Sequence, residues 1–232
     1  MQLYGNNAND ITNNLFIGKP LDGIYDYKMI GIWQQGDNFS SDPSAKPGDI
    51  KFADLNGNGK IDVGDKTYLG SQLPKYTAGM TNTFKYKEFS LSFFLQTVQG
   101  VMKYNGFYNE AGQTGRINLP SNFGYWTPQN KSNLYPSLTY TNSLGYTYPS
   151  NASFTRIKDM TFSYTFPKSM LEHLKIPALQ IYASGRNLAT FTKWRGWDPE
   201  TDTSSSAASG NQSSSFYPLV ASVVIGLNIT LQ

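Results

Sequence analysis

The chain has 232 residues, a formal net charge of +3 and no cysteine. Its Lys and Arg residues are scattered rather than clustered, which argues against a nucleic-acid-binding surface, and without cysteine there is neither thiol catalysis nor a disulfide-stapled fold. Aromatic residues make up 15% of the chain, yet the mean hydropathy is only -0.43, and no apolar run approaches the roughly 18 residues of a membrane-spanning helix. Alternating apolar and polar residues, as in the wall of a membrane β-barrel, would reconcile these values.

Period-2 alternation along the chain predicts antiparallel strands, each with one apolar and one polar face. In chain order, the expected strands are a less regular candidate at Tyr25–Trp33, then Tyr76–Tyr86, Phe89–Thr97, Met160–Phe166, Leu179–Arg186 and Val223–Leu231. Several of these segments run for about 9–11 residues, the length that a tilted strand needs to cross a bilayer. Strands of soluble proteins are shorter on average, at roughly 5–6 residues.

The connections between the strands alternate in length. Lys87 and Glu88 form a tight turn and Pro167–Pro177 a compact connection, whereas residues 34–75, 100–153 and 193–217 form long segments. Membrane barrels have tight periplasmic turns on one rim and long extracellular loops on the other. We therefore expect an all-β fold: about five or six antiparallel strands of a larger transmembrane barrel, with the long segments outside the cell and the C-terminus on the periplasmic side.

Residues 54–65, in the first long segment, match the spacing of an EF-hand calcium loop. Such a loop supplies oxygen ligands at fixed positions around a glycine that permits a sharp turn. The matching residues are Asp54, Asn56, Asn58, the Lys60 carbonyl and Asp65, with Asp62 acting through water. We expect a weak Ca²⁺ site that stabilises the loop. The alternative is an Asx-rich turn in which the same side chains bind only their own backbone.

Features of catalysis are sparse. A Ser–His–Asp triad would have to use His173, which lies in the compact Pro167–Pro177 connection. This residue is better interpreted as a solvated residue of the turn. The sequence has neither the glycine spacing of a nucleophile elbow nor a complete dinucleotide-binding fingerprint. We do not expect an enzyme.

Aromatic residues crowd the second and third long segments. Rings among polar side chains suit a protein interface or a ligand with apolar faces, such as a sugar. They suit equally well the aromatic girdle of a membrane barrel and the packing of long loops against one another. The residues considered for ligand or partner binding are Tyr104, Tyr108, Tyr125, Trp126, Trp194 and Trp197.

Three segments, taken together and in this order, resemble the C-terminal third of SusC/RagA-type TonB-dependent transporters. They are GDIKFADLNGNGKID at 48–62, LPKYTAGMTNTF at 73–84, and IYASGRNL at 181–188, which is followed by Trp197-Asp198-Pro199-Glu200. The resemblance implies a piece of a plugged barrel of about 22 strands in a gram-negative outer membrane. It also implies import of oligosaccharides or peptides, driven through TonB, together with a SusD-like surface lipoprotein that closes over the barrel.

The family's plug domain, TonB-contacting segment and signal peptide have no counterpart in this sequence. The chain is therefore expected to be a fragment or a cleaved product that completes a barrel with the rest of the same transporter. An open sheet with lipid-facing sides cannot persist alone in a bilayer. The chain also ends on Leu231-Gln232, where such barrels usually end on an aromatic residue.

A second hypothesis comes from a different class of protein: a secreted, calcium-stabilised β-sandwich that binds carbohydrate through its aromatic loops. Alternation alone fits both, because the strands of a sandwich also have one apolar and one polar face. The order of short and long connections and the strand lengths favour the barrel.

Overall fold

The computed structural model describes residues 8–105, 123–174, 176–196, 198–200 and 219–230. These residues are almost entirely in strands and connections, with short helical turns. The chain divides into two compact units. The first is built mainly from residues 1–73 and 102–150, and the second from residues 74–101, 151–202 and 215–232. Within the described residues, no helix has the length and apolar character needed to span a membrane.

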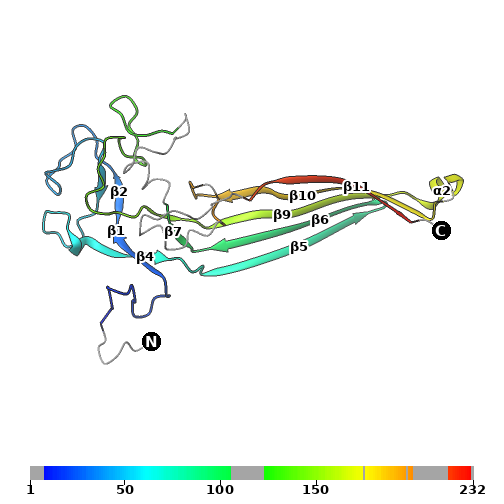
Figure 1. The fold of residues 1–232 in the computed structure, drawn as a ribbon, viewed down its shortest axis with the longest axis horizontal. Coiled ribbons are helices and arrows are strands. Elements are labelled where there is room, and N and C mark those ends of the chain that lie inside the picture. Colours follow the sequence, from blue (N-terminus) through cyan, green and yellow to red (C-terminus); the bar gives the residue numbers. More distant parts are fainter. Residues whose placement is uncertain (1–7, 106–122, 175, 197, 201–218, 231–232) are drawn as a thin grey trace. The chain divides into compact units, whose positions relative to one another are not determined.

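The second unit contains a five-stranded antiparallel sheet in the order β5-β6-β9-β10-β11 (Figure 1). Each strand pairs with the long strand that precedes it in the sequence, so the sheet runs up and down without a crossover. The strands are β5 (Tyr76–Tyr86), β6 (Phe89–Gln99), β9 (Phe154–Thr165), β10 (Ala178–Thr192) and β11 (Ser222–Thr230). These strands contain 9 to 15 residues, which confirms the five most regular predicted strands and their unusual length.

Short connections gather at one end of this sheet, as predicted. The β5–β6 turn consists of Lys87 and Glu88, and Lys87 adopts a positive φ of 51°. The β9–β10 connection is folded into α2 (Lys168–Leu171) and η2 (Glu172–Leu174), and α2 lies at the same end as the end of β11 (Figure 1). The long connections, residues 100–153 and 193–221, leave from the opposite end. The assignment of the two ends to the periplasm and the cell exterior stays a prediction.

The two faces of the sheet differ in polarity. Cross-strand partners share a face, and the pairs Phe84–Leu91 and Leu91–Phe162 place apolar side chains in one row. This apolar face is exposed: Phe84 is 58% exposed, Phe162 48% and Ile225 81%. A β-sandwich would cover such a face with a second sheet. The exposed apolar face therefore argues against the sandwich hypothesis and fits a segment of barrel wall.

The expectation of a sixth wall strand at Tyr25–Trp33 is wrong. This segment forms two short strands of the first unit, β1 (Gly23–Tyr27) and β2 (Met29–Ile32). All but one of the β1 residues are buried, so both faces of β1 are covered, whereas a wall strand leaves one face exposed. Alternation within the segment therefore reflects packing inside the first unit.

The described parts of the first two long segments contain short strands. Residues 34–75 contain β3 (Ile50–Phe52), η1 (Val63–Asp65) and β4 (Lys66–Ser71). Strand β3 pairs with β2, and β4 pairs with β1. Two further strands near the ends of segment 100–153, β7 (Met102–Tyr104) and β8 (Pro149–Asn151), pair with each other.

The first unit has an aromatic core of its own. Its buried members come in equal numbers from the short strands β1 to β3 and from connections. They are Tyr27, Ile32, Ile50, Phe52, Trp126, Tyr140, Tyr146 and Tyr148. Buried Asp26 ties β1 to this core, since one of its carboxylate oxygens accepts hydrogen bonds from the Thr147 backbone N–H at 2.8 Å and from the Thr147 hydroxyl.

Candidate functional site

Hydroxyl and amide side chains line the polar face of the five-stranded sheet and bond to one another across strands. The Thr83 hydroxyl donates to the Ser92 hydroxyl at 3.1 Å, and the Asn228 amide donates to the Gln180 carbonyl oxygen at 3.0 Å. Two aromatic rings on this face cover glycines of the neighbouring strand: a Cβ on Gly226 would lie 2.4 Å from the Tyr182 ring, and a Cβ on Gly79 2.9 Å from the Phe94 ring. The face is therefore hydrophilic but closely packed.

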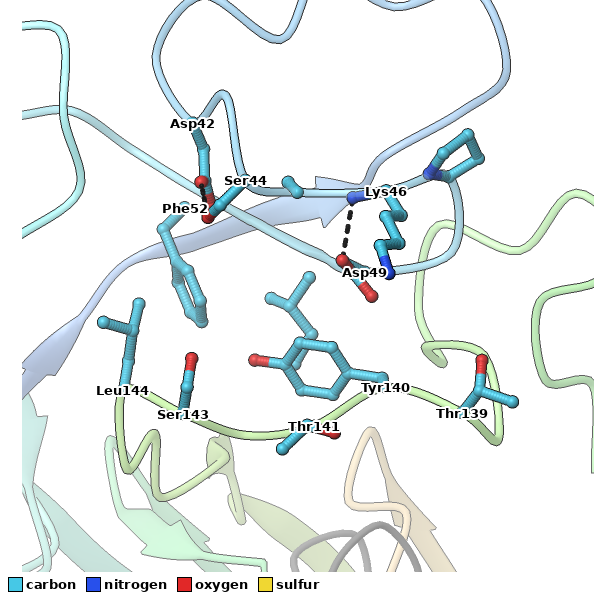
Figure 2. Close-up of a pocket in the computed structure, with 13 residues that line it drawn as sticks. Asp42, Ser44, Lys46, Asp49, Phe52, Thr139, Tyr140, Thr141, Ser143 and Leu144 are labelled. Atoms are coloured by element: carbon cyan, nitrogen blue, oxygen red, sulfur yellow. Dashed lines mark hydrogen bonds between the residues drawn. The ribbon is translucent and has the colours of Figure 1, made fainter.

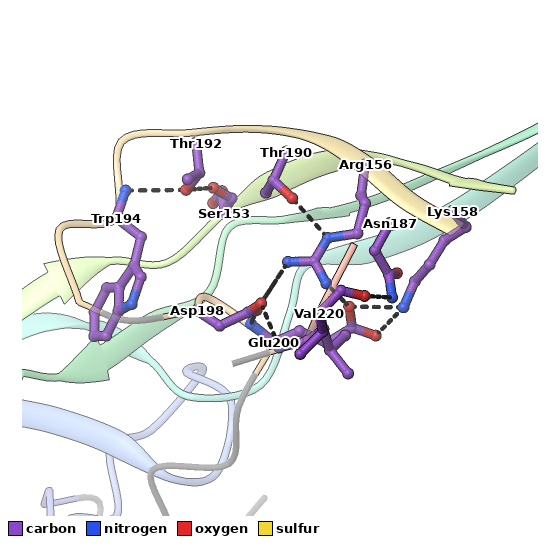
Figure 3. Close-up of polar contacts among 11 residues, drawn as sticks. Ser153, Arg156, Lys158, Asn187, Thr190, Thr192, Trp194, Asp198, Glu200 and Val220 are labelled. Atoms are coloured by element: carbon purple, nitrogen blue, oxygen red, sulfur yellow. Dashed lines mark hydrogen bonds and ion pairs between the residues drawn. The ribbon is translucent and has the colours of Figure 1, made fainter. Parts of the chain in front are cut away.

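A network of four charged side chains occupies the polar face near the end of the sheet with the long connections (Figure 3). Arg156 of β9 is only 2% exposed and forms an ion pair with Asp198, in which Nη2 lies 2.8 and 2.9 Å from the two carboxylate oxygens. Its Nη1 lies 2.9 Å from Glu200 Oε2, and its Nε donates to the Thr190 hydroxyl at 2.8 Å. Lys158 completes the network through Glu200, at 2.6 Å.

The network fixes the start of the connection that follows β10. Asp198 also accepts hydrogen bonds from the backbone N–H groups of Glu200, at 2.8 Å, and Leu219, at 3.2 Å. A buried arginine is tolerated only when its charge and its donors are matched, and here two carboxylates and a hydroxyl match them. Residues 198–200 are thereby held against the wall strands β9 and β10.

The sequence patterns did not predict this network. A weak signal was available. Arg156, Lys158 and Asp159 form a charged stretch just before the regular alternation begins at Met160, and Asp198 and Glu200 lie in the DPE part of the family-like motif. Pairing the two signals requires the strand register, because more than 40 residues separate the partners.

The predicted calcium loop, residues 54–65, folds around its own backbone N–H groups. Asp54 accepts from the N–H groups of Gly57 and Gly59, at 2.7 and 2.9 Å. Asn56 accepts from the N–H of Asn58, and Asn58 from the N–H of Lys60, both at 2.9 Å. These contacts form the Asx-rich turn that was the alternative interpretation, and they leave further lone pairs on the same oxygens.

Asp65 is the centre of this loop and is fully buried. Its Oδ1 accepts from the N–H groups of Leu55 and Asn56, and its Oδ2 accepts from the N–H of Asp62. Asp62 in turn accepts from the N–H of Gly64, so the pair forms a capping box at η1. Burial raises the pKa of Asp65, but the three N–H groups together outweigh burial and lower it.

Calcium binding by this loop stays a prediction. The carboxylates concerned are Asp54, Asp62 and Asp65, and the carbonyl is that of Lys60. In the part of the chain that the structure describes, no three carboxylate or imidazole side chains converge as a metal cluster. A bound ion would therefore be held by few carboxylates together with amide and carbonyl oxygens, as expected for a weak site.

The four candidate aromatic residues that the structure describes are divided between the two units. Trp126 lies in the core of the first unit, and its indole N–H donates to the Gln34 side chain at 2.9 Å. Trp194 is buried with Val101 and Ala152 in the second unit. Tyr104 and Tyr125 are half-buried, and burial raises the pKa of Tyr104.

The remaining two aromatic candidates, Tyr108 and Trp197, lie outside the described residues. The packing interpretation fits the burial of Trp126 and Trp194, and ligand binding stays a prediction for the set. His173 is an exposed residue of η2.

Comparison with known proteins identifies the family to which the chain belongs. It is 30% identical over 226 residues to TonB-dependent receptor P3 of Formosa agariphila, an alignment that covers 91% of this chain and 22% of the receptor. It is 29% identical over 192 residues to TonB-dependent receptor SusC of Bacteroides thetaiotaomicron, covering 81% of this chain and 18% of SusC. The chain belongs to the SusC/RagA-type TonB-dependent transporters.

The fold of this transporter segment agrees with that assignment. It is similar to the structure of the RagAB peptide transporter, with a TM-score of 0.61 and 24% sequence identity over 89% of this chain and 22% of the RagAB chain. No family model matches the sequence. The segment spans about a fifth of the length of the curated relatives that it matches.

Proposed function

We propose that the chain is part of the barrel wall of an outer-membrane TonB-dependent importer. The observation that carries this proposal is the five-stranded up-and-down sheet, with one exposed apolar face and one polar, hydrogen-bonded face. A sheet of this kind is stable in a bilayer only as part of a closed barrel. The apolar face then contacts outer-membrane lipid, and the polar face lines the interior.

The rest of the proposed transporter consists of the other barrel strands and a plug, which the remainder of the same protein supplies. We propose oligosaccharides or peptides as its substrates, a SusD-like surface lipoprotein as its partner, and the TonB system as its energy source. The support is that its relatives include SusC and that its fold resembles the RagAB peptide transporter. These relatives carry the names of receptors and transporters, and we propose transport without a catalytic step for this chain.

Membrane topology gives a direct test, because the chain contains no cysteine of its own. In the full-length transporter, Leu138→Cys and Met170→Cys each introduce a thiol at an exposed position, in the first unit and in α2 respectively. In intact cells, a membrane-impermeant maleimide is expected to label the Leu138→Cys variant and to leave the Met170→Cys variant unlabelled. Both variants should react after the outer membrane is permeabilised. Labelling of Met170→Cys alone in intact cells would show that the topology is the reverse of the proposed one.

Transport itself is tested by uptake. Cells that express the full-length transporter with its lipoprotein should accumulate labelled oligosaccharide or peptide, and dissipation of the proton gradient should stop accumulation. Uptake that is unaffected by loss of TonB would contradict the proposal.

A further inference from the structure

The first unit contains a pocket of about 360 Å³ that none of the predicted site residues lines. Figure 2 shows its two walls: residues 42–52, which lead into and include β3, and the connection 139–144, which carries Tyr140 between two threonines. This volume lies at the lower end of the range for small-molecule sites, about 300–1,000 Å³.

The pocket is held open by backbone contacts. The Gly48 N–H donates to the Trp33 carbonyl and the Ser137 N–H donates to the Gly48 carbonyl, both at 2.8 Å. Gly48 has a φ of 98°, and a Cβ there would lie 2.6 Å from the Trp126 ring and 2.8 Å from Ser137. Only glycine permits this close approach. The two walls are therefore joined just beside the pocket, and its shape is present before any ligand binds.

The pocket is lined by polar groups that can accept or donate hydrogen bonds. Asp42 Oδ1 accepts from the Ser44 hydroxyl at 2.7 Å, and Asp49 Oδ2 accepts from the Lys46 backbone N–H at 2.8 Å. The opposite wall contributes the hydroxyls of Thr139, Thr141 and Ser143. Burial raises the pKa of Asp49, and so does the charge of Asp42, while the N–H and the ammonium group of Lys46 oppose them. A ligand hydroxyl that donates to Asp49 would restore the solvation that this carboxylate has lost.

Apolar side chains contribute little surface to the pocket, because Ile50 and Phe52 are only 2% and 3% exposed and Tyr140 is 9% exposed. Two carboxylates and one ammonium group leave a small negative charge, which disfavours anionic ligands. An extended peptide pairs its backbone with a strand edge, but β3, which supplies Ile50 and Phe52, is three residues long. A neutral sugar ring fits better, because its hydroxyls both donate and accept hydrogen bonds and so match the carboxylates and hydroxyls that line the pocket.

We propose that this pocket is a carbohydrate-binding subsite of the transporter, with Asp49 as the central acceptor for sugar hydroxyls. The inference rests on the proposed import function, since it selects one of the two substrate classes. It identifies residues 42–52 and 139–144 as the segments that contact substrate outside the barrel wall.

Calorimetric titration of the detergent-solubilised full-length transporter with short neutral oligosaccharides of glucose, galactose, mannose and xylose tests the subsite. Asp49→Asn keeps the acceptor for the Lys46 N–H and removes the charge, so it should fold as the parent does. Because a hydrogen bond to a charged group is lost, affinity for the bound sugar should fall roughly ten- to hundredfold. The control is Asp22→Asn, which neutralises an exposed carboxylate of the same unit at a φ of 54° that asparagine tolerates.

Three results would overturn the subsite. They are no binding of any of these sugars to the parent protein, equal affinity in the Asp49→Asn variant, or, in a parallel titration with a neutral peptide, peptide binding that Asp49→Asn weakens while sugar binding is unaffected. Failure of the import function is distinguishable. The parent would then bind sugar with an affinity that depends on Asp49, yet cells would not accumulate the sugar.

Discussion

The buried ion pair between Arg156 and Asp198 should be among the most sensitive points of the barrel wall. Arg156 and Asp198 have side chains 2% and 7% exposed, and removing one partner of such a pair leaves an uncompensated buried charge. The expected cost is about 3–5 kcal/mol, roughly a hundredfold to a thousandfold or more in the equilibrium between the pinned and released connection. Arg156→Met keeps most of the apolar stem and removes the charge and the four donated hydrogen bonds.

The chain offers a matched control on the same sheet. Arg186 of β10 pairs with Asp159 of β9 at 3.3 Å, but these side chains are 76% and 53% exposed. An exposed pair contributes about 0–1 kcal/mol, so Arg186→Met should be nearly neutral. Urea unfolding of the full-length transporter in detergent, together with hydrogen exchange of residues 186–200, measures both variants. Equal losses for Arg156→Met and Arg186→Met would refute the reasoning, because burial would then not determine the cost.

Four further predictions follow from the register and from the first unit. Leu91→Arg on the apolar face should cost about 2–4 kcal/mol near the membrane midplane whereas Ser92→Arg should be tolerated, and equal loss of heat-resistant folded barrel in gel electrophoresis would contradict the register. Because the pKa of Asp65 is lowered from 3.8, the ionised carboxylate stabilises loop 54–65. This stabilisation is complete above pH about 4 and is lost as the pH falls through the lowered pKa. Proteolysis of loop 54–65 should accelerate in that acidic window, and Asp65→Asn should remove the acceleration. Calcium should slow proteolysis of the same loop at neutral pH with half-effect near 10⁻⁴–10⁻³ M, roughly the range of weak extracellular sites, and equal protection of an Asp54→Ala variant would show that the loop binds no ion there. Gly48→Ala should lower the melting temperature of the first unit, since both its φ and its neighbours exclude a Cβ, and an unchanged melting temperature would mean that the two walls can separate without cost.

The sequence alone was enough to predict the barrel-wall segment. One-sided burial demands a period of two in every strand, and this chain keeps it along Phe89–Gln99 and Ser222–Thr230 with few interruptions. The tight turn could also be predicted from the local sequence, because only Lys87 and Glu88 separate the two strands and a connection of two residues forms a hairpin. Where the alternation shifts by one residue, the predicted strand was shorter than the observed one. Strand β9 begins at Phe154, but a bulge at Lys158 moves the polar face from even to odd residue numbers, so only the part from Met160 onward looked regular.

Tertiary structure alone decided the arrangement of the long segments and of the charges. Tyr25–Trp33 alternates like a wall strand, yet its side chains pack into the aromatic core of the first unit, and alternation cannot distinguish lipid from a folded neighbour. The pairing of Arg156 with Asp198 depends on strand register, on a bulge and on the path of a connection, none of which has a local signature. Likewise, the pocket around Asp49 exists because Gly48 brings two segments into contact across about 90 residues of sequence. Local patterns fix which face of a strand is apolar, whereas contacts between distant residues fix which polar groups meet.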